Sequence, residues 1–147
     1  MTSEEEAEEV RRVNGEFYRV IENLDLAEME NVWVKEPSVS CVHPGWGLLV
    51  GWEAVRSSWE AIFRNTVEIR FTITDVEVQV RGALAWVTCT EDILSETRGN
   101  IGVTSVLTTN IFERRGGRWL MVHHHASHIF SDRPEPEPEP PEPTEFA

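Results

Sequence analysis

The stretch Trp119-Leu-Met-Val-His-His-His-Ala-Ser-His128 decides the fold and follows the turn Arg114-Arg-Gly-Gly-Arg118. It mixes bulky apolar residues with imidazoles. Because successive side chains of a strand point to opposite faces, an extended chain here places an apolar row on a core with histidines beside it. We predict that this stretch is the last strand of a curved sheet.

Upstream of it, apolar residues recur with a period of two, as in half-buried strands. The pattern predicts an antiparallel meander joined by short glycine-containing turns, with strands at Arg70–Val80, Leu84–Leu94, Ile101–Arg114 and Arg118–Ile129. Two shorter strands, Ser38–His43 and Leu48–Val50, flank the chain break Pro44-Gly-Trp-Gly47.

The N-terminal half has the spacing of helices. Ser3-x-x-Glu6 fits a capping box ahead of a long amphipathic helix that reaches Leu24. Asp25-x-x-Glu28 predicts a second, short helix ended by Pro37, and a third runs from Trp52 to Phe63. Helices followed by a meander indicate an α+β fold with the helices on one face of the sheet.

The chain of 147 residues, 40% of them apolar, has room for one domain with a sizeable core. Its net charge of -13 comes mainly from its two ends, where residues 4–9 and the segment from Pro134 hold ten of the 26 acidic residues. The remaining 16 acidic residues nearly balance 13 basic ones. Because no basic face is evident, we expect no nucleic-acid partner.

We divide the chain into a folded domain, residues 1–130, and an acidic tail, residues 131–147, which the Pro-Glu alternation predicts to be disordered. No apolar run approaches the ~20 residues that span a bilayer, and the N-terminus does not resemble a signal peptide. We therefore expect a cytoplasmic protein without membrane contact. Cys41 and Cys89 lack metal or disulfide spacing and are predicted to be buried thiols.

The turn at Gly116 determines which side chains share a face, since a shift of one residue reverses every side chain. A two-residue loop places Asn110 on the face of His123 and His125. A three-residue loop with a bulge places Asn110 on the face of His124, and this face has the mainly apolar composition of a small-molecule cavity. We favour the second register, with Trp119, Met121, His123 and His125 on the opposite face.

The segment Phe112-Glu-Arg-Arg-Gly-Gly-Arg-Trp-Leu-Met-Val-His-His-His-Ala-Ser127 resembles the end of SnoaL-like domains in the nuclear-transport-factor-2-like superfamily. That family ends in W-x-x-V-H-x-H-x-S after a charged glycine turn. His43-Pro and the segment from Gly51 to Trp59 are similar to its strand-to-helix segment, so the resemblance covers about residues 8–130. Ketosteroid isomerases and the association domain of calcium/calmodulin-dependent kinase are related to this family.

The resemblance implies a cone-shaped, strongly curved antiparallel sheet, with three helices over its concave face, a pocket inside and a homodimer through the convex face. The resemblance places Asn110, Trp86, Thr88 and Thr90 on the pocket wall. The favoured register adds Thr108 to the ligand-binding residues, and Trp46, beside the rim loop, could cover a flat apolar ligand. The implied dimer interface contains Trp119, Met121, His123 and His125.

His124 is the candidate base, because a neutral imidazole in an apolar cavity can remove a proton next to a carbonyl when Asn110 or Thr108 orients it. Tyr18 is the candidate donor. Glu91 and Asp92 lie in the middle of a predicted strand. We favour the interpretation that they mark the point where the strand leaves the core for solvent; the alternative is that one carboxylate is buried and acts as a base. His123 and His125 could share a metal ion, but no carboxylate flanks them, so no metal and no cofactor is expected.

Two hypotheses follow. The first is a small-molecule pocket, with isomerase, cyclase or hydratase chemistry on an apolar or polycyclic ligand. The second is a non-catalytic dimerisation or assembly module with a vestigial pocket. The sequence leaves open whether the protein is an enzyme.

Overall fold

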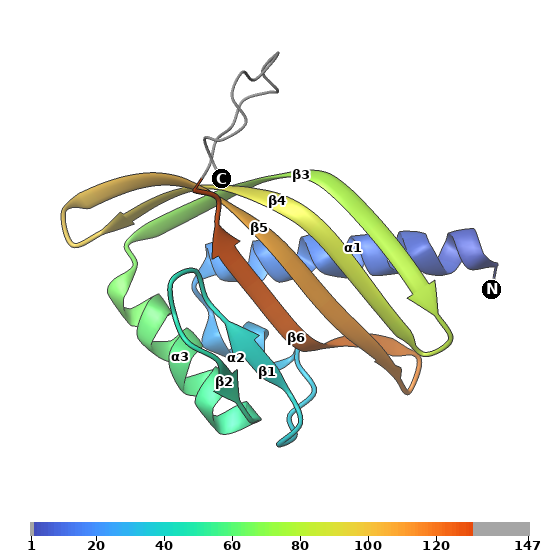
Figure 1. Ribbon diagram of the computed structural model, residues 1–147. Coiled ribbons are helices and arrows are strands. Elements are labelled where there is room, and N and C mark those ends of the chain that lie inside the picture. The colour runs from blue at the N-terminus through green and yellow to red at the C-terminus, as the bar shows by residue number, and fades with distance from the viewer. Residues whose placement is uncertain (1, 131–147) are drawn as a thin grey trace, which may run out of the picture.

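The computed structural model describes residues 2–130, and it confirms the predicted α+β class (Figure 1). Three helices occupy the N-terminal half: α1 (Ser3–Asn23), α2 (Leu26–Glu30) and α3 (Trp52–Asn65). The strands are β1 (Ser40–Val42), β2 (Leu49–Val50), β3 (Glu68–Arg81), β4 (Leu84–Thr97), β5 (Asn100–Arg115) and β6 (Arg118–His128).

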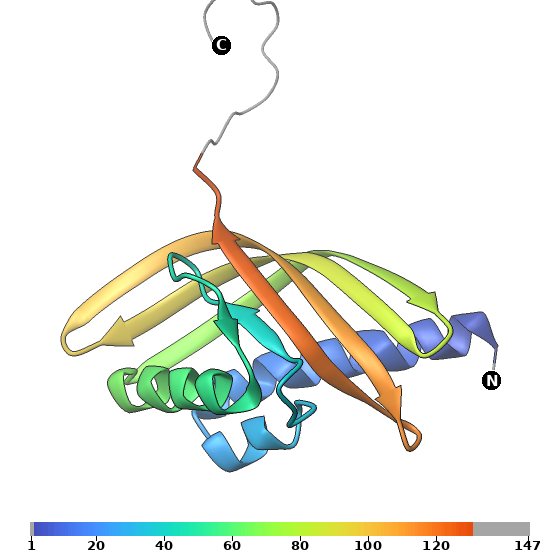
Figure 2. The same ribbon diagram turned by 60° about the horizontal axis from the view of Figure 1, so that its bottom comes forward.

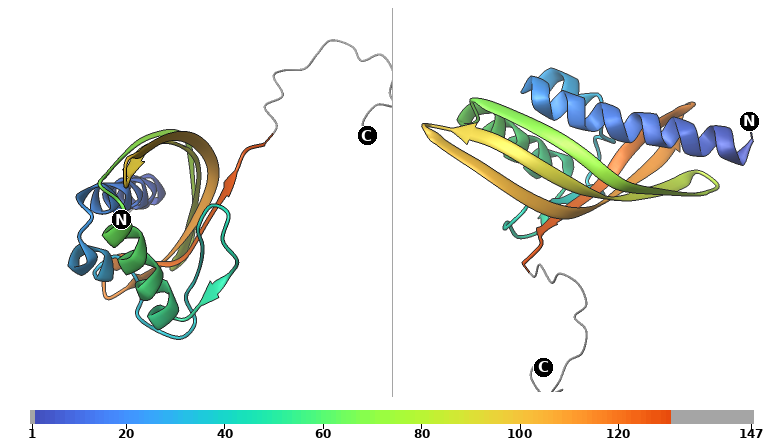
Figure 3. Two further views of the ribbon diagram at one scale, coloured as in Figure 1. Left: turned by 90° about the vertical axis from the view of Figure 1, so that its left-hand side faces the viewer. Right: turned by 90° about the horizontal axis from the view of Figure 1, so that it is seen from above.

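The six strands form one sheet in the order β2-β1-β6-β5-β4-β3. Every pair is antiparallel except β1 and β6, which run parallel. The sheet is strongly curved and unclosed, and the helices lie on its concave side (Figures 2 and 3). This curvature produces the predicted cone and brings α1 against the inner face of the long strands.

Helix α1 begins at a capping box one residue earlier than predicted. The Thr2 hydroxyl accepts a hydrogen bond from the Glu5 amide, and the Glu5 carboxylate accepts one from the Thr2 amide. The apolar stripe of the helix is buried, and includes Phe17 and Ile21. The cap fixes where the helix starts, and the stripe fixes which face meets the sheet.

Helix α2 has the predicted Asp25 cap but only five residues, and it ends well before Pro37. The prediction that Pro37 ends it is wrong, because the following backbone pairs with β6 instead. The Val34 amide donates to the Met121 carbonyl, and the Met121 amide donates to the Val32 carbonyl. Trp33, between them, is buried in the core.

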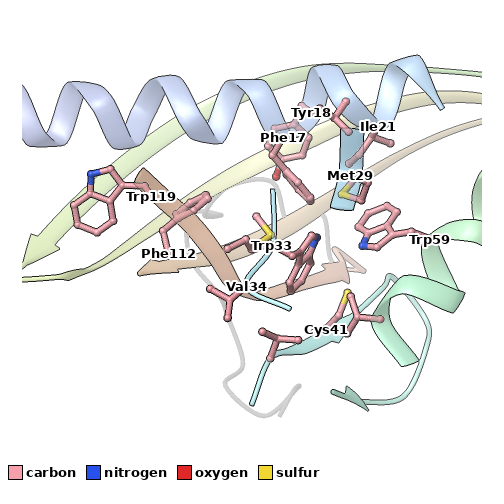
Figure 4. Packing of buried hydrophobic residues seen from close by; sticks show 14 of the residues in the cluster. Phe17, Tyr18, Ile21, Met29, Trp33, Val34, Cys41, Trp59, Phe112 and Trp119 are labelled. Atoms are coloured by element: carbon pink, nitrogen blue, oxygen red, sulfur yellow. The ribbon is translucent and has the colours of Figure 1, made fainter. Parts of the chain in front are cut away.

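The core fills the space between the concave face and the helices, as Figure 4 shows. Buried aromatic side chains from α1, α3, β5 and β6, together with Trp33 after α2, contribute to it, which matches the amphipathic pattern of the sequence. The two thiols, Cys41 and Cys89, are free and buried in the same cluster, as predicted.

The β5–β6 hairpin combines features of both predicted registers. Its turn is the two-residue loop Gly116-Gly117, because Arg115 pairs with Arg118. The register then shifts within β6, where Phe112 pairs with Met121 but Ile111 pairs with His123, so that Val122 is the extra residue. The predicted bulge exists, but it lies inside the strand and not in the turn.

The position of this bulge decides which side chains enter the core. Before it, Trp119 and Met121 lie on the concave face, and both are buried in the core. The assignment of these two residues to the opposite face, as part of a dimer interface, is therefore wrong. After the bulge, His124 pairs with Asn110 and is buried on the concave face, while His123 and His125 lie on the convex face.

Candidate functional site

A buried polar cluster occupies the concave face where β4, β5 and β6 pass beneath α1. We call it the concave-face cluster: Asn14, Tyr18, Glu91, Thr108, Asn110 and His124. Each residue is nearly inaccessible to solvent, although each carries a polar or ionisable group. Because burial of such groups is costly unless they are paired, a cluster of this kind is a candidate functional site.

Asn110 is the centre of the cluster and fixes its hydrogen-bond directions. Its Nδ2 donates to Oδ1 of Asn14 at 2.9 Å and to the hydroxyl of Tyr18 at 3.1 Å. Its Oδ1 lies 2.6 Å from Nδ1 of His124. Since both Nδ2 hydrogens are used and Oδ1 can only accept, Nδ1 of His124 must carry the proton. The neutral imidazole therefore keeps the lone pair on Nε2.

The Tyr18 hydroxyl continues this chain to Glu91. It accepts from Asn110 and donates to Oε2 of Glu91 at 2.5 Å. The carboxylate thus ends a hydrogen-bonded series that starts at the His124 ring. Glu91 does not leave the core for solvent, so the favoured interpretation of that residue was wrong and the alternative, a buried carboxylate, is correct.

Burial and proximity shift the pKa values of the groups around Tyr18. Desolvation raises the pKa of Glu91, opposed by the hydrogen bond from Tyr18. The pKa of Tyr18 lies well above its ordinary value because of burial and the neighbouring Glu91 carboxylate. Burial also raises the pKa of Cys89, whose Sγ lies 3.6 Å from the Tyr18 hydroxyl, so the thiol stays protonated at neutral pH.

His124 sits among aromatic rings. Its ring centroid lies 5.0 Å from that of Phe17 and 6.0 Å from that of Trp59. Burial lowers the pKa of His124 well below its ordinary value, with a smaller contribution from His43. The imidazole is consequently neutral at physiological pH, with its proton on Nδ1 and none on Nε2.

A second buried imidazole, His43, flanks the same tryptophan. Its ring is 4.7 Å from Trp59 and 6.2 Å from His124, measured between centroids. Ser58 donates its hydroxyl hydrogen to the Val55 carbonyl and must therefore accept from Nε2 of His43, at 2.8 Å. Burial lowers the pKa of His43 to about 4, so this ring is neutral as well.

Three buried polar atoms find no hydrogen-bond partner among residues 2–130: Nε1 of Trp33, Nε1 of Trp59 and Oγ1 of Thr108. The Thr108 hydroxyl lies near enough to Glu91 to lower the pKa of that carboxyl, but no partner completes a bond to it in good geometry. An indole N–H can only donate. Leaving such a group unpaired costs roughly 1–3 kcal/mol.

Three of the predicted ligand-binding residues point away from the cluster. Trp86, Thr88 and Thr90 alternate along β4 with the fully buried Val87 and Cys89, so they face the convex side. The prediction was wrong by one residue, because the buried alternation Ala85, Val87, Cys89 and Glu91 sets the parity of this strand and leaves Trp86, Thr88 and Thr90 on the other face. Asn110 and Thr108, in contrast, lie on the concave face as predicted.

Trp46 lies on the loop between β1 and β2, where 44% of its surface is exposed. Its ring packs edge-on against His43, with centroids 4.8 Å apart. Trp46 therefore covers the His43 ring, which in turn packs against Trp59, and it does not line the concave-face cluster directly. Its contact with His43 is the way in which it bears on the site.

The His123 and His125 rings lie 5.9 Å apart on the convex face, and Ser40 Oγ is 2.7 Å from Nδ1 of His123. Within the described part of the chain, no group of three His, Cys, Asp or Glu side chains is arranged to hold a metal ion.

A separate hollow of about 340 Å³ lies between α1 and the β5–β6 turn, and Glu9, Arg12, Arg118 and Trp119 are among its lining residues. Of the described helices, none is both long and apolar enough to cross a membrane.

Comparison with known proteins identifies the family. The SnoaL-like domain matches residues 10–131, most of the chain. The chain belongs to the SnoaL-like family. This finding confirms the resemblance inferred from the β5–β6 region. The F-box protein SKIP8 of Arabidopsis thaliana is 32% identical over 120 residues, 82% of this SnoaL-like chain. The chain spans only about half, 49%, of that curated relative.

Solved structures support the same assignment. A nuclear-transport-factor-2-like protein of Streptomyces avermitilis, provisionally named a dehydratase, superposes with a TM-score of 0.83 at 38% identity, over 88% of this chain and all of that one. A provisional calcium/calmodulin-dependent kinase II association domain of Thiobacillus denitrificans gives a TM-score of 0.70 at 28% identity, over 80% of this chain and 92% of that one. The SnoaL-like domain thus shares its fold with proteins of different roles.

Sequence reasoning brought Tyr18, Asn110, Thr108 and His124 to one site but missed Glu91 and Trp59. The signal for Glu91 was present, since it continues the buried alternation Ala85, Val87, Cys89 along β4. No local signal marks Trp59, because its place on the apolar stripe of α3 is typical of any core tryptophan.

Proposed function

We propose that the concave-face cluster of this SnoaL-like domain binds a small apolar or polycyclic molecule and removes a proton from it, with His124 as the base. The observation that carries the proposal is the fixed tautomer of His124, whose Nδ1 donates to Asn110 and whose Nε2 keeps a lone pair among aromatic side chains. Isomerisation, aldol-type cyclisation and dehydration next to a carbonyl can each begin with such a step.

The hydrogen-bonded chain supports this role. When Nε2 takes a proton from a carbon next to a carbonyl, the bonding electrons move to the carbonyl oxygen and the imidazole becomes positive. Its Nδ1–H bond to Asn110, which is linked through Tyr18 to Glu91, orients the ring and stabilises that charge. The proton can then return to another carbon or to a leaving hydroxyl. The Tyr18 hydroxyl already donates its hydrogen to Glu91. It therefore links Asn110 to the carboxylate and has no hydrogen left to donate to the ligand.

The relationship to the Streptomyces avermitilis protein supports dehydratase-type chemistry in particular. Loss of water from a β-hydroxy carbonyl compound needs a base for the carbon-bound proton and a proton for the departing hydroxyl. A single imidazole can do both in sequence. Among the buried polar groups of the described residues none is Arg or Lys, which favours an uncharged ligand.

The test is base-catalysed hydrogen exchange on a model ketone. Wild-type protein in D₂O should accelerate deuteration of 1-indanone next to its carbonyl, followed by proton NMR. His124→Gln should lower the protein-dependent rate by about 10²-fold or more. The matched control is His125→Gln, which changes the neighbouring imidazole on the opposite face and should leave the rate unchanged. Equal rates for wild type and His124→Gln would exclude His124 as the base.

A second candidate function is a non-catalytic dimerisation module. It is favoured by the exposed apolar side chains of the convex face, where Ile101, Val103 and Leu107 follow one another along β5. A homodimer through this face is compatible with either function. An assembly role is also in keeping with the kinase association domain that the chain resembles.

A further inference from the structure

The indole N–H of Trp59 is a buried donor without an acceptor, and it lies beside both neutral imidazoles. Only 3% of the Trp59 surface is exposed, and no described residue accepts a hydrogen bond from its Nε1. The ring comes from α3 and packs against Phe17 at 5.8 Å between centroids. A stabilising role in packing needs the indole body but has no use for an unpaired N–H.

The groups around Trp59 cannot satisfy this donor. The Nε2–H of His43 is committed to Ser58, and the Nδ1–H of His124 to Asn110. Each ring keeps one lone pair, yet neither forms a hydrogen bond with the indole. The rings of His43 and Trp59 are nearly perpendicular, at 88°, and those of Trp59 and His124 are inclined by 40°. The Nδ1 lone pair of His43 has the Cys41 thiol as its hydrogen-bond partner, with Sγ 4.0 Å away. The indole N–H of Trp59 thus remains without an acceptor beside the two imidazoles.

A second unpaired donor belongs to the same region of the core. Nε1 of Trp33 is also buried and without a partner among residues 2–130. In the close view of Figure 4 the nitrogen edges of Trp33 and Trp59 are turned toward one another. An oxygen atom with two lone pairs, such as that of a carbonyl, is the group that such donors recognise.

We propose that the Trp59 indole N–H binds an acceptor oxygen of the ligand, next to the His124 base. This inference rests on the proposed function and deepens it by naming the substrate class: an uncharged aromatic compound that carries a carbonyl oxygen, in preference to a hydrocarbon of the same shape. The bound N–H also stabilises negative charge on that oxygen when His124 removes the neighbouring proton. Trp59 is then a ligand-binding residue. Asn110 and Tyr18, whose donors are already paired, do not contact the ligand and instead orient His124.

The test compares two probes of matched shape, 1-indanone and indane, by NMR titration. Wild-type protein should bind the ketone about tenfold more tightly than the hydrocarbon, the equivalent of one hydrogen bond. Trp59→Phe, which keeps the aromatic ring and removes the N–H, should reduce that ratio to near one. The matched control is Trp119→Phe, which changes a buried tryptophan at the start of β6, across the bulge from His124. This variant should keep the tenfold preference.

The outcomes separate this inference from the proposed function. If Trp59→Phe keeps the tenfold preference, the inference is wrong, while loss of exchange in His124→Gln would still support the base. If wild-type protein binds neither probe, both proposals fail. Should Trp59→Phe not fold, the wild-type indole signals still decide: the Trp59 N–H resonance, assigned through contacts with the His43 ring, should move downfield with 1-indanone and stay in place with indane. Equal shifts with both probes would overturn the inference.

Discussion

At the scale of single residues, the two buried imidazoles show how hydrogen-bond direction determines chemistry. Asn110 makes His124 a donor at Nδ1, and Ser58 makes His43 a donor at Nε2. The two rings therefore offer opposite nitrogens as acceptors, although both are neutral. Identity alone does not distinguish them; their partners do.

The lowered pKa of His43 predicts how stability depends on pH. The folded value, about 4, lies below the ordinary value of 6.5, so the unfolded chain binds the proton more tightly. Stability should be fully present above about pH 6.5 and fall by roughly 3 kcal/mol as the pH drops toward 4. His43→Gln should flatten this part of the curve, measured by urea unfolding at several pH values.

The other groups near His43 define the control. His124 titrates in the same sense, so some slope should remain in the variant, and the Cys41 thiol, with a pKa of about 12, stays protonated throughout. Glu91 contributes equally to both proteins. His128→Gln, on the exposed end of β6, should reproduce the wild-type curve. Parallel curves for wild type and His43→Gln would contradict the assignment of the buried neutral imidazole.

At the scale of elements, the β5–β6 hairpin positions the site. Both turn glycines have positive φ, 55° at Gly116 and 80° at Gly117, as a tight two-residue hairpin requires. The bulge at Val122 then reverses the faces of the residues that follow. Without it His124 would lie on the convex face, and the concave-face cluster would lack its imidazole.

The turn geometry predicts a difference between two glycine substitutions. A Cβ at Gly117 or at Gly47 meets no other atom within 4 Å, but only Gly117 has positive φ. Gly117→Ala should therefore lower the free energy of unfolding by about 1–2 kcal/mol through backbone strain alone. Gly47→Ala should have little effect or stabilise slightly. Chemical denaturation measures both, and equal effects would show that the turn is not strained by a side chain.

At the scale of the whole molecule, the curved sheet has two contrasting faces. The concave face carries the core and the polar cluster, whereas the convex face exposes apolar side chains on its long strands. Ile101, Val103 and Leu107 are 72%, 80% and 55% exposed. A row of this kind is typical of a surface that another protein covers, which supports the proposed homodimer.

The proposed dimer predicts that a charge on the convex face yields monomers. Leu107→Glu should shift the protein from dimer to monomer in analytical ultracentrifugation, because burying an unpaired carboxylate is costly. Val67→Glu, at an equally exposed apolar position between α3 and β3, should leave the dimer intact. A wild-type protein that is monomeric at high concentration would contradict the proposal.

The sequence by itself determined the α+β class, the order of helices and strands, the buried thiols and the family. These follow from local periodicity, capping and turn residues, which depend on neighbours a few positions away. The sequence also predicted that His124 and Asn110 share a face, although the bulge that produces this arrangement was expected in the turn. Tertiary structure alone decided that this bulge lies at Val122, which moved Trp119 and Met121 into the core.

Tertiary structure likewise decided the chemistry of the cluster. Glu91 is paired with a tyrosine 73 positions away, and Trp59 is left without an acceptor by partners on other elements. Such pairings depend on how far a curved sheet closes around a helix, and no local pattern encodes that distance. The identity of a residue fixes which hydrogen bonds it can form, but only the packed structure decides which of them it does form.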